Sequence, residues 1–573
     1  MTIYEADFPV PAVLTAPGGC YEIEQRRFRG RDYPMFKHAP RTLGALLGEA
    51  LVRLRCRADE RMTEQDGVVT TFGEFERGSA ALSLFLQEAM AVRPGKHVAV
   101  VMANRVEWMM SFFAILAAGA VPVLVNSRGA GPEILRAVNM TDCVAAICDQ
   151  ERHALLVGDA GWPGPVVLLG ESASGTHDFA QAAAARPGLM LKFAARDPEA
   201  AAFIMFSSGT TGFPKAIVHS QGGAAHALTM GMLAIEAFDF LYEAEFGVPP
   251  ARGLPKKFPP NIISSPMFHG GGVVPYLRSI ITGQATIIVT RWNADTVFDI
   301  MEREGVSRLS LVPTMIFDML ASPRAQGGVM SQLRYLANGT AALSPKVAAA
   351  FREALPNCLM LNTYAQSESL ERVTTFGGRE FEQNLAAVGR VAPTIRLRIL
   401  RDDRSDADPG EPGEIAVLGA MTMSGYYNDP EATAEAICDG WLLTGDIGRF
   451  DEKGLLHIVD RKKNMVICGG ENIYCAEVER VLNEHPAVAE SIAFGEPHGR
   501  LGERLVAVAV LKPGMDANED ELKAYAKANL AIYKVPRAIA FSNDPLPRNA
   551  TGKVAKGVFL AGFDRPWVVE MPG

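Results

Sequence analysis

Short apolar stretches that recur between helical ones limit most strongly what this chain can fold into. Residues 97–102, 144–148 and 166–169 have strand length, carry mostly apolar side chains and are bounded by polar or turn-forming residues. Two further candidate strands are residues 335–339 and 359–364. Because strands that alternate with helices form parallel sheets covered on both faces, the pattern predicts an α/β fold.

The uncharged run over residues 108–125 is long enough to resemble a transmembrane helix. Gly119 and Pro122 interrupt it, so we interpret it as a buried helix over residues 108–118 and a strand over residues 121–125. The first seven residues lack the positive region and apolar core of a secretory signal. The eight cysteines form no Cys-x-x-Cys pair and no Cys/His cluster, which fits reduced thiols and gives no metal site. We therefore expect a cytoplasmic protein without a transmembrane segment.

The 573 residues are too many for one ordinary core and predict about two to four domains. After residue 460 the elements become short: a helix over residues 476–485, strands over residues 487–494 and 505–511, and a helix capped by Asn518. We therefore predict a large N-terminal domain, residues 1–460, and a small α+β C-terminal domain, residues 461–573.

The first 45 residues combine proline, glycine and charge with little periodicity, and we expect an extended arm over the main body. Its basic side chains are interpreted as a solvated face; they are Arg26, Arg27, Arg29, Arg31 and Lys37. The formal net charge of −9 argues against nucleic acid as a partner.

Residues 206–215, Phe-Ser-Ser-Gly-Thr-Thr-Gly-Phe-Pro-Lys, lead from a candidate strand into a loop suited to phosphate. Hydroxyls, flexible glycines and a lysine can all face an anion there. Ordinary surface turns share this composition, and the spacing does not match a P-loop. The loop residues in question are Ser207, Ser208, Gly209, Thr210, Thr211, Gly212 and Lys215.

The run His269-Gly270-Gly271-Gly272 could form the oxyanion hole of a lipase-type hydrolase. That alternative requires a Gly-x-Ser-x-Gly nucleophile motif, which the sequence does not contain. Elsewhere, polar residues follow candidate strands at residues 340–345 and 364–368, where α/β sheets bind ligands.

Six stretches in order resemble the adenylate-forming superfamily of acyl-CoA synthetases, luciferases and peptide-synthetase adenylation domains. They are residues 207–215, 364–368, 444–446, 460–463, 469–474 and 547–553, and the resemblance spans roughly residues 45–560. It implies a large N-terminal domain of parallel-sheet α/β subdomains and a β subdomain, with a small mobile C-terminal domain. It also implies that a carboxylate attacks the α-phosphate of ATP, giving acyl-AMP and pyrophosphate, and that a thiol then takes the acyl group. ATP, Mg²⁺ and CoA are the implied substrates and cofactor.

The resemblance assigns roles to single residues. Lys553 would stabilise charge at the α-phosphate, and Glu368 would bind Mg²⁺, because a hard cation prefers carboxylate oxygen. Thr210, Thr211 and Lys215 would contact the β- and γ-phosphates. A solvated tail lysine and a helix-start glutamate are the ordinary alternatives for Lys553 and Glu368. The remaining residues assigned to ATP or AMP are Ser207, Ser208, Gly209, Gly212, Gly339, Thr340, Ala341, Tyr364, Ala365, Gln366, Ser367, Asp446 and Arg461.

Within that set, Tyr364 would stack on adenine, Asp446 would accept the ribose hydroxyls and Arg461 would donate to them. Ala365 and Ser367 stand where the family often has Gly and Thr, which puts fine geometry in doubt but not activity.

The second half-reaction implies a moving C-terminal domain. Lys463 occupies the hinge position of the family, and Gly469 and Gly470 lie where a pantetheine arm passes close to the backbone, which glycine permits. Cys468 and Cys475 flank these glycines and are expected to be small buried hydrophobic residues, not nucleophiles.

The acyl pocket implied by the resemblance contains no Asp or Glu, which disfavours an amino-acid substrate and leaves a fatty or aryl carboxylic acid. His269 resembles the aromatic gate of that pocket, although a structural histidine fits as well. The three glycines from residue 270 are expected to leave room for the acid. The pocket residues are His269, Gly270, Gly271, Val312, Thr314 and Met315, together with residues 339–341.

The sequence therefore predicts an acid–CoA ligase. Transfer to a carrier-protein pantetheine, a luciferase-type oxygenase and an inactive nucleotide or acyl sensor are the alternatives. A homodimer is one assembly that the resemblance allows.

Overall fold

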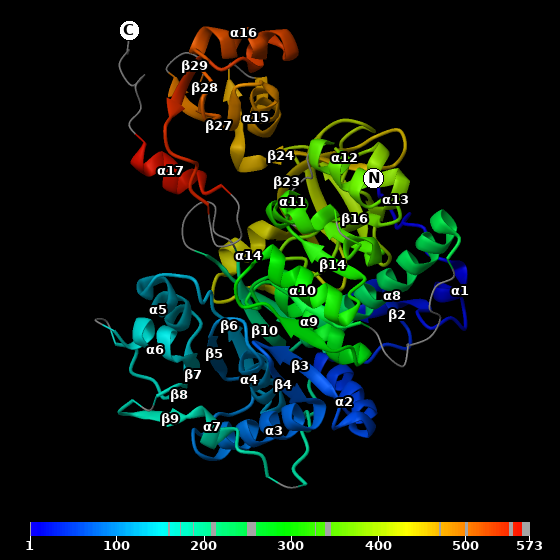
Figure 1. The fold of residues 1–573 in the computed structure, drawn as a ribbon, viewed down its shortest axis with the longest axis vertical. Helices are drawn as coiled ribbons and strands as arrows, with labels where there is room; N and C mark the ends of the chain where they lie inside the picture. The colour runs from blue at the N-terminus through cyan, green and yellow to red at the C-terminus, as the bar shows by residue number, and fades with distance from the viewer. Residues whose placement is uncertain are drawn as a thin grey trace.

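The computed structural model describes residues 2–158, 161–171, 173–186, 188–207, 214–248, 259–326, 328–338, 345–468, 471–498, 502–548 and 554–563 (Figure 1). Its largest sheet has eight strands in the order β21-β11-β10-β6-β5-β7-β8-β9. Strands β10, β6, β5, β7, β8 and β9 run parallel, whereas β11 and β21 are antiparallel to their neighbours. The bounds are β5 His97–Val101, β6 Val121–Leu124, β7 Cys143–Asp149, β8 Val166–Leu169, β9 Thr176–Asp178, β10 Ala201–Phe206, β11 Ala216–Ser220 and β21 Gly425–Tyr426. The predicted parallel α/β sheet is confirmed.

Helices connect the parallel strands, as predicted. Helix α3 starts at a capping box in which Thr71 and Glu74 exchange hydrogen bonds. Helix α4 is the apolar helix expected near residue 108, and its aromatic side chains, such as Trp108 and Phe112, are fully buried. The helices around this sheet are α3 Phe72–Glu88, α4 Val106–Ala117, α5 Gly131–Met140, α6 Gln150–Val157, α7 Phe179–Ala182 and α8 Gln221–Phe246.

Within the described residues, α8 alone is long and apolar enough to cross a membrane, and 67% of its most apolar window is buried inside the protein. Such a burial pattern is typical of a core helix.

Two further sheets extend the large N-terminal part. One has the order β12-β13-β3-β4 and the other β14-β15-β16-β17-β18. Their strands are β3 Arg61–Gln65, β4 Val68–Thr71, β12 Asn261–Ile263, β13 Thr286–Ile288, β14 Arg308–Leu311, β15 Tyr335–Asn338, β16 Leu359–Tyr364, β17 Thr374–Gly377 and β18 Arg390–Val391. The accompanying helices are α2 Leu43–Leu54, α9 Gly270–Thr282, α10 Ala294–Glu304, α11 Pro313–Ala321, α12 Pro345–Ala354 and α13 Gly378–Gln383.

An antiparallel sheet follows, in the order β19-β20-β23-β22 with β24 beside β23. Its elements are β19 Arg396–Leu400, β20 Gly413–Leu418, α14 Pro430–Ala436, β22 Ile437–Cys438, β23 Trp441–Phe450 and β24 Leu456–Arg461. Strands β23 and β24 form an antiparallel hairpin. Short 3₁₀ helices occur at Arg55–Arg57, Pro323–Gln326, Met330–Gln332, Lys462–Asn464 and Ile532–Lys534.

The last sheet has its own hydrophobic core, built from residues such as Val478, Leu482 and Leu522. Figure 1 shows this sheet and its helices at one end of the molecule, beyond β23 and β24. Asn518 caps α16 by accepting the Glu521 N–H at 3.0 Å, as predicted. The elements are β25 Met465–Cys468, β26 Glu471–Tyr474, α15 Cys475–Glu484, β27 Val488–His498, β28 Gly502–Leu511, α16 Glu519–Asn529, β29 Ala538–Ser542 and α17 Lys556–Gly562.

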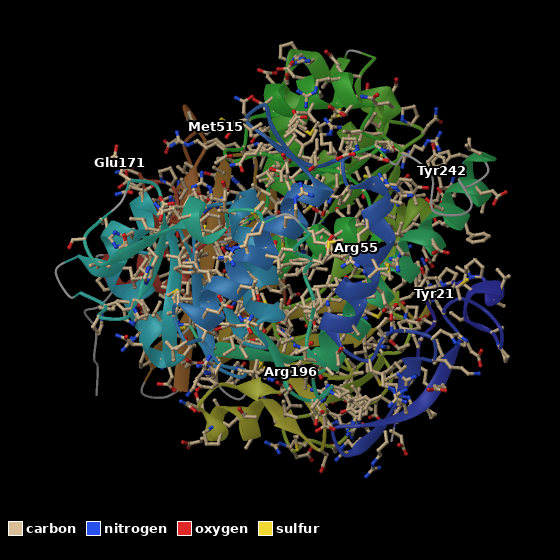
Figure 2. All side chains as sticks on the ribbon, turned by 90° about the horizontal axis from the view of Figure 1, so that it is seen from below. Tyr21, Arg55, Glu171, Arg196, Tyr242 and Met515 are labelled. Atoms are coloured by element: carbon tan, nitrogen blue, oxygen red, sulfur yellow. The ribbon has the colours of Figure 1, made fainter. Side chains whose placement is uncertain are left out.

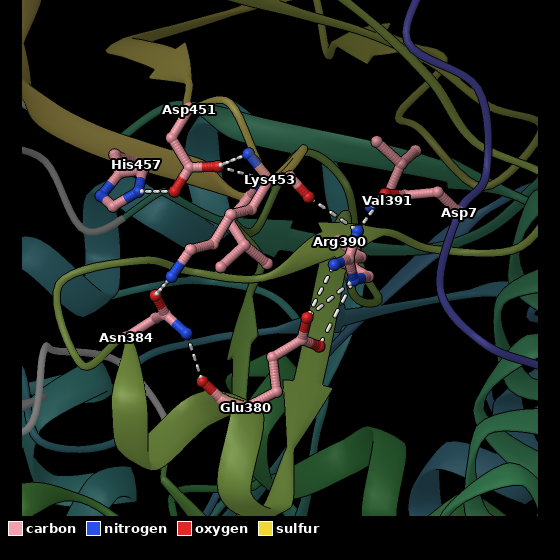
Figure 3. Close-up of polar contacts among 9 residues, drawn as sticks. Asp7, Glu380, Asn384, Arg390, Val391, Asp451, Lys453 and His457 are labelled. Carbon is pink, nitrogen blue, oxygen red and sulfur yellow. Dashed lines mark hydrogen bonds and ion pairs between the residues drawn. The ribbon is translucent and has the colours of Figure 1, made fainter.

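The N-terminal arm lies on the main body, as expected, but contains a short helix, α1 Ala12–Thr15, and a hairpin of β1 Ile23–Phe28 and β2 Arg31–Phe36. Tyr21, which Figure 2 labels on the same side of the molecule as Tyr242 of α8, donates to Glu236 of α8 at 2.6 Å. Near the chain start, Asp7 accepts from Arg390 at 2.9 Å (Figure 3). The interpretation of its basic side chains as a solvated face is wrong for Arg29, whose guanidinium is buried against the body because backbone carbonyls there need donors.

Candidate active site

The loop after β10 is closed at its neck by two hydrogen bonds. The Ser207 N–H donates to the Lys215 carbonyl at 3.0 Å, and the Lys215 N–H donates to Ser207 Oγ at 3.0 Å. These bonds hold the two ends of the predicted phosphate loop together. Its other predicted residues lie outside the described part of the chain: Ser208, Gly209, Thr210, Thr211 and Gly212.

Tyr426 joins the end of this loop to the predicted metal ligand. The Lys215 ammonium lies 4.8 Å from the centre of the Tyr426 ring, and the Tyr426 hydroxyl donates to Glu368 Oε1 at 3.2 Å. Tyr426 sits opposite Ile217 in the pairing of β21 with β11, which sets its position. The sequence analysis missed this residue, because strand pairing between distant segments leaves no local signal.

The carboxylate of Glu368 is largely buried, and nearby cations offset little of the cost of burying its charge. Burial raises its pKa above the usual value, against the opposing effects of hydrogen bonding to Tyr426 and the charge of Arg461. The described residues contain no cluster of three or more His, Cys, Asp or Glu that could hold a metal ion. A single buried carboxylate fits Mg²⁺ of the kind that takes its other ligands from phosphate and water.

The backbone around Glu368 is fixed from two sides. The Met423 N–H donates to the Glu368 carbonyl at 2.7 Å, and His219 Nε2 lies 3.0 Å from the Ser367 carbonyl. Burial lowers the pKa of His219 to about 3, so the ring is neutral and its Nε2–H donates. Nearby, Gln366 Nε2 is buried without a hydrogen-bond partner among the described residues, which suits a ligand acceptor. Ala365 is exposed.

Tyr364, Asp446 and Arg461, which the resemblance assigns to the nucleotide, contact one another. The Tyr364 hydroxyl donates to Asp446 Oδ2 at 2.6 Å, and Arg461 Nε lies 3.2 Å from Asp446 Oδ1. Burial and then the charge of Asp446 raise the pKa of Tyr364 well above its usual value. Each carboxylate oxygen of Asp446 keeps a further lone pair, so two ribose hydroxyls can be accepted without breaking either contact.

Strand register places this group. Asp446 on β23 is opposite Arg461 at the end of β24, and Tyr364 is the last residue of β16. The Asp446 N–H donates to Thr444 Oγ1 at 3.1 Å, and that hydroxyl donates to the Ile415 carbonyl at 2.7 Å. The backbone of β23 around Asp446 is therefore fixed before any ligand binds.

The predicted acyl residues begin α9. His269 is the N-cap residue, its ring centre lies 4.6 Å from that of Phe268 with the two ring planes tilted by 48°, and Gly270 and Gly271 begin the helix. A Cβ at Gly271 would meet nothing closer than 3.9 Å, which leaves the predicted room. A Cβ at Gly272 would lie 2.2 Å from the Pro266 carbonyl oxygen, so that glycine serves close packing and the expectation that it widens the pocket is wrong.

Val312 is the N-cap residue of α11, and Met315 Sδ accepts from Ser264 at 3.8 Å. The side chain of Thr314, and all of Gly339, Thr340 and Ala341, lie outside the described residues. The acyl pocket between these segments therefore stays a prediction.

A buried ionic group connects α9 to the segment that follows Glu368 in the chain. Arg278 Nη1 lies 3.0 Å from Glu371 Oε2, and Arg372 Nε lies 2.9 Å from Glu371 Oε1. Burial alone would raise the pKa of Glu371, but the charges of Arg372 and Arg278 outweigh it and hold that pKa below its usual value.

Lys553, Gly469 and Gly470 lie outside the described residues, as does the side chain of Lys463 within the 3₁₀ helix Lys462–Asn464. A bridge between Arg548 and Val554 brings together the two ends of the segment that carries Lys553. Cys475 is buried, as expected, and burial raises its pKa to about 12, whereas Cys468 is only half-buried.

Tyr364 and Arg461 at the ends of β16 and β24, Asp446 within β23 and the nearby Glu368 form the group of side chains expected in a nucleotide-binding α/β enzyme. The family of AMP-binding enzymes matches residues 52–427, and the C-terminal domain of AMP-binding enzymes matches residues 477–553. The chain belongs to the AMP-binding enzyme family.

Among its relatives is a 2-succinylbenzoate–CoA ligase of Bacillus cereus (strain AH820), 30% identical, with 82% of this chain and 88% of that protein covered. An indoleacetate–CoA ligase of Aromatoleum aromaticum is 31% identical, with 84% and 90% covered. The structure of o-succinylbenzoate CoA synthetase from Bacillus subtilis with its acyl-adenylate has a TM-score of 0.74 at 26% identity, covering 90% of this chain and 98% of that one.

An amide bond synthetase from Marinactinospora thermotolerans has a TM-score of 0.75 at 27% identity, covering 89% and 98%. The predicted fold, the class of enzyme, an AMP-forming acid–CoA ligase, and the use of ATP, Mg²⁺ and CoA are confirmed.

Proposed function

We propose that this ligase activates an aryl-bearing carboxylic acid as its acyl-AMP and passes the acyl group to CoA, with the predicted residues in their assigned roles. The observation that carries the proposal is the contact group of Tyr364, Asp446 and Arg461 next to Glu368. The group offers a ring for adenine, acceptors for ribose and a carboxylate for the cation of the phosphates.

In the first step the acid's carboxylate attacks the α-phosphorus, the bond to the bridging oxygen breaks, and pyrophosphate leaves. Asp446 and Arg461 hold the ribose, so the α-phosphate is fixed relative to the acid. Lys215 and the loop that it closes bind the leaving phosphates. Bound Mg²⁺, held by Glu368, would supply neutralisation of phosphate charge.

Lys553 would stabilise the charge that builds up on the α-phosphate. In the second step the CoA thiolate attacks the acyl carbonyl and AMP leaves. This step needs Lys553 to withdraw, so we propose a domain boundary at residues 460/461, a hinge at Lys463 and a pantetheine path along Gly469 and Gly470. Lys553→Ala should slow acyl-AMP formation about 10²- to 10³-fold. Lys463→Pro should spare that step and slow thioester formation.

The described residues that we assign to the acyl pocket favour an acid whose body carries no charge. His269, Gly271, Val312 and Met315 offer aromatic, small and apolar groups, with no carboxylate to hold an amino group. The relatives named for 2-succinylbenzoate and indoleacetate both act on acids with an aromatic ring. We therefore favour an aryl-bearing acid over a fatty acid.

The cell location and assembly are also proposals. All eight cysteines are free, which fits a reducing cytoplasm, where ATP and CoA are available. A homodimer is the assembly that light scattering would test.

The test is pyrophosphate release with ATP and a panel of aryl, arylacetic and fatty acids, followed by the product mass with CoA, a carrier protein or an amine. We expect release with aryl-bearing acids and an acyl-CoA product. Release with none of the acids would favour a sensor. Transfer only to the carrier, or only to an amine as in the amide bond synthetase, would replace CoA as the acceptor.

A further inference from the structure

The N-terminal hairpin lies outside both matched family segments, yet it contacts the loop next to Glu368. Arg29 Nη1 donates to the carbonyls of Thr422 at 2.9 Å and Met423 at 2.8 Å, and its Nη2 donates to Ala420 at 2.9 Å. One planar guanidinium thus gathers three backbone carbonyls of a single loop, which arginine's fork of donors permits and lysine's ammonium does not.

The position of Arg29 is costly for an arginine. It takes a left-handed conformation, φ 46°, followed by Gly30 at φ 72°, the pair of a type I′ hairpin turn. Asn or Gly is the usual residue at the first of these positions, since a Cβ there is strained. Burial also lowers the pKa of Arg29, whose guanidinium lies 4.8 Å from the Phe28 ring centre. An arginine at a turn position that favours Asn or Gly, with its guanidinium buried away from water, indicates a functional role.

The loop that Arg29 binds also contacts Glu368. The Met423 N–H donates to the Glu368 carbonyl at 2.7 Å, while the Met423 carbonyl accepts from Arg29. The next residue, Ser424, donates to the Val218 carbonyl at 2.8 Å, and Tyr426 then reaches Glu368 Oε1. One short segment therefore connects the guanidinium to both the backbone and the carboxylate of Glu368.

The arm does not depend on Arg29 to stay in place. Asp7 accepts from the Val391 N–H at 2.8 Å and from Arg390, which also binds Glu380 (Figure 3). Tyr21 donates to α8, and Tyr4 stacks 3.8 Å from Phe450. Removing the guanidinium should therefore release the loop without detaching the arm.

We propose that Arg29 is a positioning residue of the adenylation site: it fixes the backbone of residues 420–423 and through it the place of Glu368. The proposal rests on the proposed role of Glu368 as the carboxylate for Mg²⁺. It makes the hairpin, which precedes the matched family segment, part of the active-site support of this chain.

Arg29→Asn tests the proposal with little strain, because Asn-Gly favours a type I′ turn and keeps the hairpin. Arg27→Gln, at an exposed position of β1 just before the turn that carries Arg29, is the matched control. The readouts are hydrogen exchange of the Met423 amide in the protein without ligands, the Mg²⁺ dependence of pyrophosphate release, and the melting temperature.

For Arg29→Asn we expect faster exchange at Met423 and, since residues that support a metal ligand typically contribute that much, a roughly 10-fold higher Mg²⁺ concentration for half-maximal rate. The KM for the acid and the exchange of α16 amides should stay unchanged. Arg29→Lys should fall between Arg29→Asn and wild type. Arg27→Gln should match wild type in every readout.

Wild-type Mg²⁺ dependence in Arg29→Asn, or faster exchange throughout the chain with no change specific to Met423, would overturn the proposal. Glu368→Gln distinguishes a failure of the role proposed for Glu368 from a failure of the role proposed for Arg29. If Glu368→Gln leaves the Mg²⁺ dependence unchanged, the role of Glu368 as the carboxylate for Mg²⁺ is wrong, and the proposal for Arg29 is wrong as well. If Glu368→Gln alters the Mg²⁺ dependence and Arg29→Asn does not, only the positioning role of Arg29 is refuted.

Discussion

Asp446 allows the most direct test of the nucleotide site. Its carboxylate is only 5% exposed and already accepts from Tyr364 and Arg461. Asparagine has nearly the same shape but no charge and one acceptor oxygen. Asp446→Asn should therefore preserve the backbone of β23. It should weaken the two hydrogen bonds that we assign to the ribose hydroxyls.

The size of the effect follows from these contacts. A hydrogen bond to a charged group contributes about 1.5–3 kcal/mol and a neutral one about 0.5–1.5 kcal/mol, so each hydroxyl loses about 1–1.5 kcal/mol. Two hydroxyls give about 2–3 kcal/mol, or about a 30- to 150-fold lower kcat/KM for ATP. The loss of folding stability should be smaller, about 1–2 kcal/mol, because the Arg461 side chain is 36% exposed and its ion pair is screened.

The assay compares pyrophosphate release with ATP and with 2′-deoxy-ATP. Wild type should prefer ATP, and Asp446→Asn should lose most of that preference. Tyr364→Phe is the control, because it removes one hydroxyl but keeps both the ring and the carboxylate, and it should keep the preference. If Asp446→Asn lowers the rate with both nucleotides equally, or with neither, Asp446 does not hold the ribose.

Three further changes test the surroundings of the site. Gly272→Ala should cost about 1–3 kcal/mol of unfolding free energy, since its Cβ would meet Pro266, whereas Gly271→Ala should keep stability and narrow the range of accepted acids; equal stability of both variants would contradict the packing argument. Glu371→Gln should lose about 3–5 kcal/mol in urea unfolding, because it leaves two buried arginines without their carboxylate, and a loss below about 1 kcal/mol would show that water compensates them. Burial raises the pKa of Glu368 in the folded protein, so ionisation of this carboxyl group opposes folding. Without ligands, the free energy of unfolding of the wild type, relative to that of Glu368→Gln, should be highest at low pH and should fall as the pH rises through the folded-state pKa of Glu368. Mg²⁺ binding should strengthen over the same pH range. A pH-independent difference between the two proteins would contradict that assignment.

The sequence predicts best what short-range patterns determine. The strand β8 Val166–Leu169 and the strand β16 Leu359–Tyr364 coincide with the predicted ranges, because continuous apolar runs bounded by turn residues leave few alternatives. The meeting of Tyr364 with Asp446 and Arg461 was predicted only through the resemblance, since the three lie on separate strands. Periodicity alone could not have paired them.

Contacts made by register and by tertiary packing escaped prediction. Tyr426 belongs to a two-residue strand whose partner, β11, lies far away in the chain, and no propensity marks it. Gly272 and Gly271 are adjacent and identical in type, yet one packs under a carbonyl and the other faces open space. Their difference comes from the fold of residues 264–268, not from the glycines themselves.

Arg29 shows the same limit in its strongest form. A cluster of basic residues in a polar arm is normally solvated, and this rule holds for its neighbour Arg27, which is exposed. The left-handed turn at Arg29 and Gly30 is what separates the two arginines, because it directs one side chain toward a loop with unpaired carbonyls. A strained backbone at a charged residue is therefore the local sign to look for, and in this chain it occurs in an arm outside the matched family segment that we propose supports the site.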